Sequence, residues 1–248
     1  MVIIIGHRGA AGLAPENTIP AIKKGIRYAD MIEFDLQPTL DQKIVLFHDR
    51  DDISRTTNST GKIPELTLKF LKTLDAGSWF SEEYTNTRIS TFKEILQIVP
   101  TNILLNIELK FYDPSSEWFE IQIIDHLKKN NLISNSFIAV RYTESIKRLQ
   151  MLESKIKCIL LQKEREESNY LQETIKYNLK YVQIRKRSLH KEFIEKCHNQ
   201  GIKVFYFYTD DEEEMVKCIK MGVDGILTNY PNILNKIKKE KNFDTLPR

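Results

Sequence analysis

The sequence of 248 residues has no long apolar run. Its first apolar segment, residues 2–5, leads directly into a polar motif. A membrane-spanning helix needs about 20 apolar residues, and the core of a signal peptide is also longer than this segment. We therefore expect no stable membrane insertion and a cytoplasmic location.

The sequence also lacks a block of basic residues. Its 37 Lys and Arg residues are interspersed with 34 Asp and Glu residues, which gives a net charge of +3. The mixed basic segment at residues 236–241 is interpreted as the solvated end of a helix. Nucleic-acid binding usually requires a basic patch or stripe, so the sequence predicts no nucleic-acid partner.

Cysteine is scarce, with Cys158, Cys197 and Cys218 only. The number is odd and no pair has metal-ligand spacing, which argues against a disulfide framework and against a zinc site. Cys158 lies in an apolar segment and is expected to pack as a small hydrophobic side chain.

The sequence does contain a regular alternation of short apolar segments and helical patterns. The first segment is continuous and β-branched, as expected of a strand buried on both faces. Eight strands are expected, at residues 2–5, 31–37, 102–109, 136–141, 157–161, 181–185, 203–208 and 225–228. A single (β/α)8 barrel has about 250 residues. The sequence therefore predicts an α/β fold, a TIM (β/α)8 barrel, as one domain over residues 1–248.

Residues 49–90 interrupt this alternation after the second strand. The segment begins with a polar, turn-rich stretch, and an apolar cluster follows it. About forty residues enclose too little core to fold alone. We therefore interpret the segment as a small inserted cap on the barrel.

Two carboxylates, Glu33 and Asp35, stand near the end of the second predicted strand. Residues two apart on a strand point to the same face, so these side chains should emerge together. Glu108 and Lys110 have the same place on the third predicted strand. A barrel brings the carboxyl ends of its strands to one face, so we expect all four side chains there.

Two histidines are expected near the same face. His7 follows the first predicted strand, and His48 follows a short return strand at residues 43–47. Asp49 either holds His48 by a hydrogen bond or only begins the next turn. The other histidines fall in helical patterns and are interpreted as structural or exposed: His126, His190 and His198.

Three carboxylates without a soft ligand suit a hard divalent cation, Mg²⁺ or Ca²⁺. Paired carboxylates also act as acid and base on sugars, but the cations beside them favour a phosphate. Arg8 can bind two oxygens at once, and Lys110 acts as a point charge. Histidine titrates near neutral pH, so His7 and His48 can take and give a proton. Together these groups favour displacement at a phosphodiester.

Aromatic residues could wall the substrate cleft. Phe207 and Tyr208 follow the seventh predicted strand, and Trp79 and Phe80 lie in the insertion. For Trp79 and Phe80, packing within the insertion is the favoured interpretation.

Taken together, these motifs resemble the glycerophosphodiester phosphodiesterase family. The resemblance covers nearly the whole chain and rests on eight stretches: His7-Arg8-Gly9, Ala14-Pro15-Glu16-Asn17-Thr18, Glu33-Phe34-Asp35-Leu36, Val45-Leu46-Phe47-His48-Asp49, Arg55-Thr56-Thr57-Asn58-Ser59-Thr60-Gly61, Leu74-Asp75-Ala76-Gly77-Ser78-Trp79-Phe80, Asn106-Ile107-Glu108-Leu109-Lys110 and Gly222-Val223-Asp224-Gly225-Ile226-Leu227-Thr228.

The resemblance implies a TIM barrel with a small insertion after the second strand. It implies a metal-dependent hydrolase of glycerophosphodiesters, which yields glycerol 3-phosphate and an alcohol such as choline, ethanolamine or glycerol. Such a reaction belongs to glycerol and lipid metabolism. The implied site has metal ligands at Glu33, Asp35 and Glu108, an acid–base pair at His7 and His48, and phosphate contacts at Arg8 and Lys110.

Three stretches depart from the family pattern: Phe207-Tyr208-Thr209-Asp210 in place of Trp-Thr-Val-Asn, Thr228-Asn229 in place of Thr-Asp, and Val140-Arg141 in place of Ser-Phe. They lie away from the predicted metal ligands, so they affect the expected substrate preference more than the expected reaction. Arg141, Arg185 and Lys186 either add positive charge at the rim or face solvent.

Two alternatives stay open. An apolar insertion that admits a lysophospholipid would make the protein a lysophospholipase D. A non-catalytic phosphate-binding module is the second, although a complete set of catalytic groups argues against it. The sequence favours His7 as the base. It does not choose between Mg²⁺ and Ca²⁺, between water and the glycerol 2-hydroxyl as attacking group, or between oligomeric states.

Overall fold

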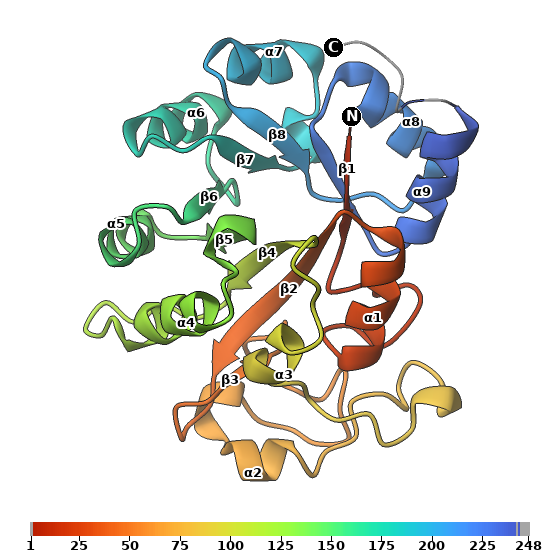
Figure 1. The fold of residues 1–248 in the computed structure, drawn as a ribbon, viewed down its shortest axis with the longest axis vertical. Helices are drawn as coiled ribbons and strands as arrows, with labels where there is room; N and C mark the ends of the chain where they lie inside the picture. The colour runs from red at the N-terminus through yellow and green to blue at the C-terminus, as the bar shows by residue number, and fades with distance from the viewer. Residues whose placement is uncertain (1, 242, 244–248) are drawn as a thin grey trace.

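Eight parallel strands form a closed ring in the computed structural model, which describes residues 2–241 and 243 (Figure 1). The order is β1-β9-β8-β7-β6-β5-β4-β2, and pairing of β1 with β2 closes the ring. The strands are β1 Ile3–Gly6, β2 Met31–Pro38, β4 Leu104–Leu109, β5 Ser136–Val140, β6 Lys157–Leu161, β7 Tyr181–Ile184, β8 Lys203–Tyr206 and β9 Gly225–Thr228. The predicted TIM barrel is confirmed.

The helices lie outside this ring (Figure 1). They are α1 Ile19–Tyr28, α2 Leu68–Leu71, α3 Phe92–Leu96, α4 Trp118–Lys129, α5 Thr143–Leu152, α6 Glu167–Lys176, α7 Lys191–Asn199, α8 Glu212–Met221 and α9 Pro231–Glu240. Local sequence sets their ends. The Thr18 side chain accepts a hydrogen bond from Ala21 N at the start of α1, and Gly222, with φ +91°, ends α8 in the left-handed conformation.

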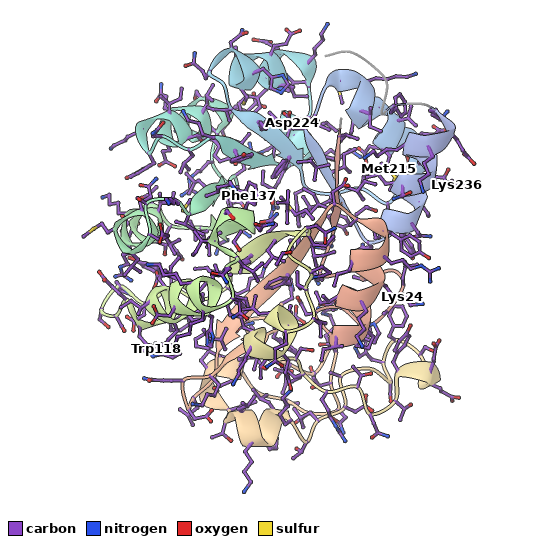
Figure 2. All side chains as sticks on the ribbon, in the orientation of Figure 1. Lys24, Trp118, Phe137, Met215, Asp224 and Lys236 are labelled. Atoms are coloured by element: carbon purple, nitrogen blue, oxygen red, sulfur yellow. The ribbon has the colours of Figure 1, made fainter. Side chains whose placement is uncertain are left out.

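Two apolar layers hold the barrel together. Inside the ring, a small cluster includes Met31, Phe137 and Phe205. Figure 2 shows Phe137 beside β5, away from the outer edge of the view. A larger cluster lies between the strands and the surrounding helices. These two clusters bury both faces of each strand. This explains why the strand sequences are nearly continuous apolar segments.

A short additional strand, β3 Ile44–Leu46, runs antiparallel to β2 and extends the sheet beyond the ring. It is the predicted return strand, reduced to three residues. The insertion that follows contains α2 and the short 3₁₀ turns Ile63–Glu65 and Glu82–Tyr84. Most of its apolar residues bury one another in a cluster of their own, which includes Ile53, Leu71 and Leu74, while Phe70 and Trp79 are exposed.

Some predicted ends differ from the observed ones. The prediction of a strand through residue 208 is wrong, because β8 ends at Tyr206. Phe207 and Tyr208 are therefore loop residues at the mouth of the barrel. Within the described ranges, 2–241 and 243, no helix is long and apolar enough to cross a membrane.

Candidate active site

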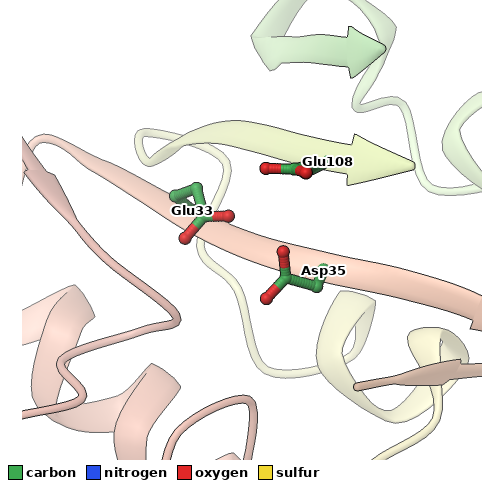
Figure 3. A group of neighbouring side chains, drawn as sticks. All are labelled: Glu33, Asp35 and Glu108. Atoms are coloured by element: carbon green, nitrogen blue, oxygen red, sulfur yellow. The ribbon is translucent and has the colours of Figure 1, made fainter. Parts of the chain in front are cut away.

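Strand pairing places three carboxylates together at the mouth of the barrel. In the parallel register of β2 and β4, Glu33 lies opposite Asn106, and Asp35 lies opposite Glu108. Glu33, Asp35 and Glu108 are buried, and one ligand oxygen of each lies within 4.8 Å of the others. Figure 3 shows the three side chains close together, Glu33 and Asp35 on β2 and Glu108 on the neighbouring β4. The predicted carboxylate cluster is thus present in the structure.

Lysine and arginine partly neutralise this cluster. Lys110 Nζ lies 2.5 Å from Glu108 Oε1 and 2.9 Å from Asp35 Oδ1. Burial opposes ionisation of Asp35, but Lys110, Arg8 and His48 outweigh it and lower its pKa. Glu33 has the opposite balance: burial, Asp35 and Glu108 raise its pKa well above the usual range.

The residues of this cluster fit a divalent cation. All three offer hard oxygen ligands, the class that Mg²⁺ and Ca²⁺ prefer. Burial raises the pKa of Glu33 most, and the nearby Asp35 and Glu108 raise it further, because like charges lie close together in the cluster. A further positive charge between Glu33, Asp35 and Glu108 would remove this repulsion.

The loop after β1 brings His7 and Arg8 to the same mouth. The backbone N–H of Arg8 donates to Glu33 Oε2 at 2.7 Å, which ties this loop to the carboxylate cluster. The Arg8 guanidinium lies 2.7 Å from Glu16 Oε1 and 3.7 Å from Asp35 Oδ2. Arg8 therefore lies beside the cluster while two carboxylates hold its side chain.

His7 is neutral at pH 7. Burial, and then the charge of Arg8, lower its pKa to about 4, although Asn229 acts in the opposite direction. Its ring stacks on Tyr208 with 4.9 Å between centroids and meets Phe207 edge-on at 5.4 Å. A neutral imidazole is the form that accepts a proton.

Asn229 determines which nitrogen of His7 carries the proton. The Asn229 side-chain amide donates to Asp210 Oδ2 at 2.7 Å, so its oxygen is the atom facing His7 Nδ1, at 2.8 Å. We assign the proton to Nδ1 on this basis. Nε2, which lies 3.9 Å from Glu33 Oε2, is then free to accept a proton. The two departures at positions 210 and 229 thus form one hydrogen-bonded pair.

The second histidine, His48, follows β3. His48 Nδ1 lies 2.7 Å from Asp49 Oδ1, and Arg55 Nε donates to Asp49 Oδ2 at 2.7 Å. Arg55 also contacts Glu16, the carboxylate that holds Arg8. His48 is close enough for its charge to lower the pKa of Asp35. Of the two interpretations of Asp49, the structure favours the hydrogen bond to His48.

The remaining predicted residues have different places. Phe207 lies at the mouth against His7. The Trp79 indole donates to Ala76 O at 3.0 Å and packs edge-on against Phe80, so these contacts lie within the insertion. The other histidines make structural contacts: His126 lies edge-on to Phe92, His190 pairs with Glu167 and caps α7, and His198 pairs with Asp224.

Several supporting residues were not predicted. Asn17 donates from Nδ2 to Asp35 Oδ2 at 2.8 Å, and its Oδ1 accepts from the Asp35 N–H. Glu16, Asn229 and Lys163 are further examples. Glu16 and Asn17 belong to a stretch that resembles the family, residues 14–18. Only the folded loop shows that Glu16 contacts Arg8 and that Asn17 contacts Asp35.

Comparison with known proteins fits this geometry. Residues 7–233 match the glycerophosphoryl diester phosphodiesterase family. The chain belongs to this family. It is 34% identical over 243 residues to YhdW of Bacillus subtilis, with 97% of this chain and 99% of the relative covered. It is 32% identical over 247 residues to a glycerophosphodiester phosphodiesterase of Caldanaerobacter subterraneus subsp. tengcongensis, with 96% and 98% covered.

A solved structure agrees in fold. The phosphodiesterase of Oleispira antarctica, determined in complex with its product sn-glycerol-3-phosphate, is 26% identical, with a TM-score of 0.86 and coverage of 97% of this chain and 96% of that chain. As a member of the glycerophosphoryl diester phosphodiesterase family, the protein is a phosphoric diester hydrolase.

Proposed function

We propose that the protein hydrolyses glycerophosphodiesters to glycerol 3-phosphate and an alcohol, with a divalent metal ion and two histidines. The observation that carries the proposal is the meeting of Glu33, Asp35 and Glu108 with His7 at one mouth of the barrel. Membership of the family supports the substrate class.

The metal ligands in this proposal are Glu33, Asp35 and Glu108. A bound Mg²⁺ or Ca²⁺ supplies Lewis-acid polarisation of a phosphoryl oxygen. Arg8 and Lys110 bind the phosphate, since both bring positive charge to the edge of the carboxylate cluster. Their existing contacts with carboxylates preorganise them for this role.

His7 acts as the general base in this scheme. Its free Nε2 takes the proton of the attacking hydroxyl. If this hydroxyl belongs to water, glycerol 3-phosphate forms directly; if it is the 2-hydroxyl of glycerol, a cyclic phosphate forms, and water then opens it to glycerol 3-phosphate. As the new P–O bond forms, the P–O bond to the alcohol breaks. His48, in its protonated form, gives a proton to the departing oxygen. Asp49 holds the His48 ring at Nδ1, which leaves Nε2 for this transfer.

A lysophospholipid substrate is less well supported. The insertion would have to offer an apolar groove for an acyl chain, yet most of its apolar residues pack into one buried cluster. Only Phe70 and Trp79 are exposed among the large apolar side chains of residues 49–90, all of which the structure describes. Substrates without acyl chains also agree with the predicted cytoplasmic location. The relatives named above give no support to a lysophospholipase D.

Release of glycerol 3-phosphate from glycerophosphoglycerol tests the proposal. We expect turnover of glycerophosphoglycerol and at least hundredfold slower cleavage of lysophosphatidylglycerol, which has the same alcohol. Faster cleavage of the lysophospholipid would favour the alternative enzyme. Absence of turnover on both, with Mg²⁺ or Ca²⁺ present, would favour a non-catalytic binding module.

A further inference from the structure

Three cations follow three consecutive strands of the ring, opposite the loop that carries His7. Arg141 follows β5, Lys163 follows β6 and Arg185 follows β7. We call these three residues the cationic arc. Since β5 pairs with β4, which carries Glu108, the arc continues directly from the carboxylate cluster.

Hydrogen bonds fix the middle of this arc. The buried Gln162 donates from Nε2 to Ser188 Oγ at 2.6 Å, and its Oε1 accepts from the N–H of Arg185 at 2.8 Å. Arg187 donates to the carbonyl of Lys163. The loops after β6 and β7 are therefore tied together, and these hydrogen bonds fix the backbone positions of Lys163 and Arg185.

Lys163 and Arg185 line a small depression beside Glu108. The rest of its lining is Glu108 itself, Leu161, Gln162, Gln183 and Phe207. Its volume is about 20 Å³, which is room for about one water-sized group. A single charged oxygen fits into the depression, while the rest of a ligand would lie in the open mouth.

Nearby carboxylates balance only part of the positive charge of the arc. Lys163 Nζ lies 3.5 Å from Glu108 Oε1, which Lys110 approaches more closely, at 2.5 Å. Within residues 2–241 and 243, the Arg141 and Arg185 guanidinium groups form no ion pair, and Arg185 lies over the Phe207 ring at 5.9 Å. Burial lowers the pKa of Lys163, and the charges of Lys110, Arg141 and Arg185 lower it further, although Glu108 opposes them.

The neighbouring Lys186 has a different role. Its Nζ lies 3.0 Å from Glu214 Oε1, and its side chain is 81% exposed. Of the cations that the sequence placed at the rim, Arg141 and Arg185 belong to the arc, and Lys186 does not. The arc is therefore a defined group of three cations at the mouth of the barrel and does not reflect a generally basic surface.

We infer that the cationic arc binds a negatively charged group, a carboxylate or a second phosphate, on the alcohol part of the substrate. The inference rests on the proposed function and narrows its substrate class. Glycerol is uncharged, so the group bound by the arc must belong to the other alcohol. Alcohols that carry a cation, such as choline and ethanolamine, would meet like charge at the arc.

A matched pair of substrates tests the inference. Glycerophosphoserine and glycerophosphoethanolamine differ only by one carboxylate on the alcohol. We expect kcat/KM of the parent protein to be about tenfold higher for the serine compound, mainly through a lower KM. In Arg185→Gln and in Arg141→Gln, this ratio should fall towards one.

Lys186→Gln is the control, since it removes one positive charge next to Arg185 but outside the arc. It should keep the ratio of the parent protein. An equal kcat/KM for the two substrates in the parent, or an equal fall of the ratio in Lys186→Gln and Arg185→Gln, would overturn the inference while leaving the proposed function in place. Absence of turnover on both substrates would instead overturn the proposed function, and the inference with it.

Discussion

At the scale of single residues, the main feature is a group of buried carboxylates that are not fully neutralised. Glu33 lies near both Asp35 and Glu108, and burial strengthens their repulsion. Lys110 offsets part of this cost through its contacts with Asp35 and Glu108. Buried charges that cost stability are typical of sites that bind a ligand or a metal.

The first prediction concerns the proposed metal ligands. Glu33→Gln and Glu108→Gln should each lower the rate of glycerol 3-phosphate release by about a thousandfold or more, because each removes an anionic ligand. The metal-free Tm should not fall for Glu33→Gln, because an uncharged amide relieves the repulsion and can still accept from the Arg8 N–H.

Glu213→Gln, on the exposed surface of α8, is the matched control and should keep full activity. Activity at the rate of the parent protein in either site variant would contradict the proposed role of these carboxylates.

The second prediction concerns Asp49. Burial opposes its ionisation, but hydrogen bonds from His48 and Arg55 hold its pKa at about 2, so it is an anion at neutral pH. Asp49→Asn should lower kcat by about 10- to 100-fold with little change in KM, because the His48 ring loses the group that orients it. Steady-state kinetics measures both constants.

Asp51→Asn removes an exposed carboxylate two residues away and should have little effect. A change confined to KM, or an equal loss in the two variants, would argue that Asp49 only supports the following turn.

Which residues could be predicted from the sequence depends on how local their partners are. Glu33 and Asp35 follow from the two-residue period of a strand, and Glu108 follows from the closure of a barrel. The contact of His7 with Asn229 spans 222 positions along the chain and depends on two loops. No periodic pattern encodes such a contact, so Asn229 could only be noted as a departure from the family.

At the scale of elements, the loop between β1 and α1 contributes His7 and Arg8 to the site and packs closely against α1. Gly9 has φ +91°, and a Cβ there would lie 2.6 Å from the carbonyl carbon of Ala21 and 2.7 Å from Ile22 N. The Gly9 N–H also donates to the carbonyl of Glu33 at 2.9 Å. Close packing on α1 therefore fixes the position of His7 and Arg8.

The third prediction separates this packing from backbone preference. Gly222 also has φ +91°, but a Cβ there would meet nothing within 4 Å. Gly222→Ala should cost about 1–2 kcal/mol of unfolding free energy, the usual penalty of a left-handed residue. Gly9→Ala should cost more than about 3 kcal/mol, because the backbone of α1 must also move.

Urea unfolding of the two variants measures these costs, and Gly9→Ala should in addition lose activity. Equal costs for the two substitutions would mean that α1 yields easily, and the loop would then not be held by packing.

The element order could be predicted from the sequence, whereas some ends could not. The apolar sequence continues to Tyr208, beyond the last residue of β8 that pairs with a neighbouring strand. The predicted strand is therefore two residues too long. At the insertion, an apolar cluster was visible, but its inward packing was not. The sequence therefore left a lysophospholipid open, which the buried cluster of Ile53, Leu71 and Leu74 makes less favourable.

At the scale of the whole molecule, closure of the ring is what makes a site. Glu33 and Glu108 come from paired strands, but His7 reaches them only because β1 pairs with both β2 and β9. The cationic arc lies across the same mouth, after β5, β6 and β7. One barrel thus presents a proposed metal site, a neutral histidine and a basic rim to a single substrate.

The most direct test of the central claim is the turnover of glycerophosphoglycerol by the parent protein after treatment with a chelator. We predict that activity is lost by at least about a hundredfold and returns when Mg²⁺ or Ca²⁺ is added in excess. The metal should also raise Tm, because it binds only the folded arrangement of Glu33, Asp35 and Glu108. Full activity in the metal-free protein would contradict the account.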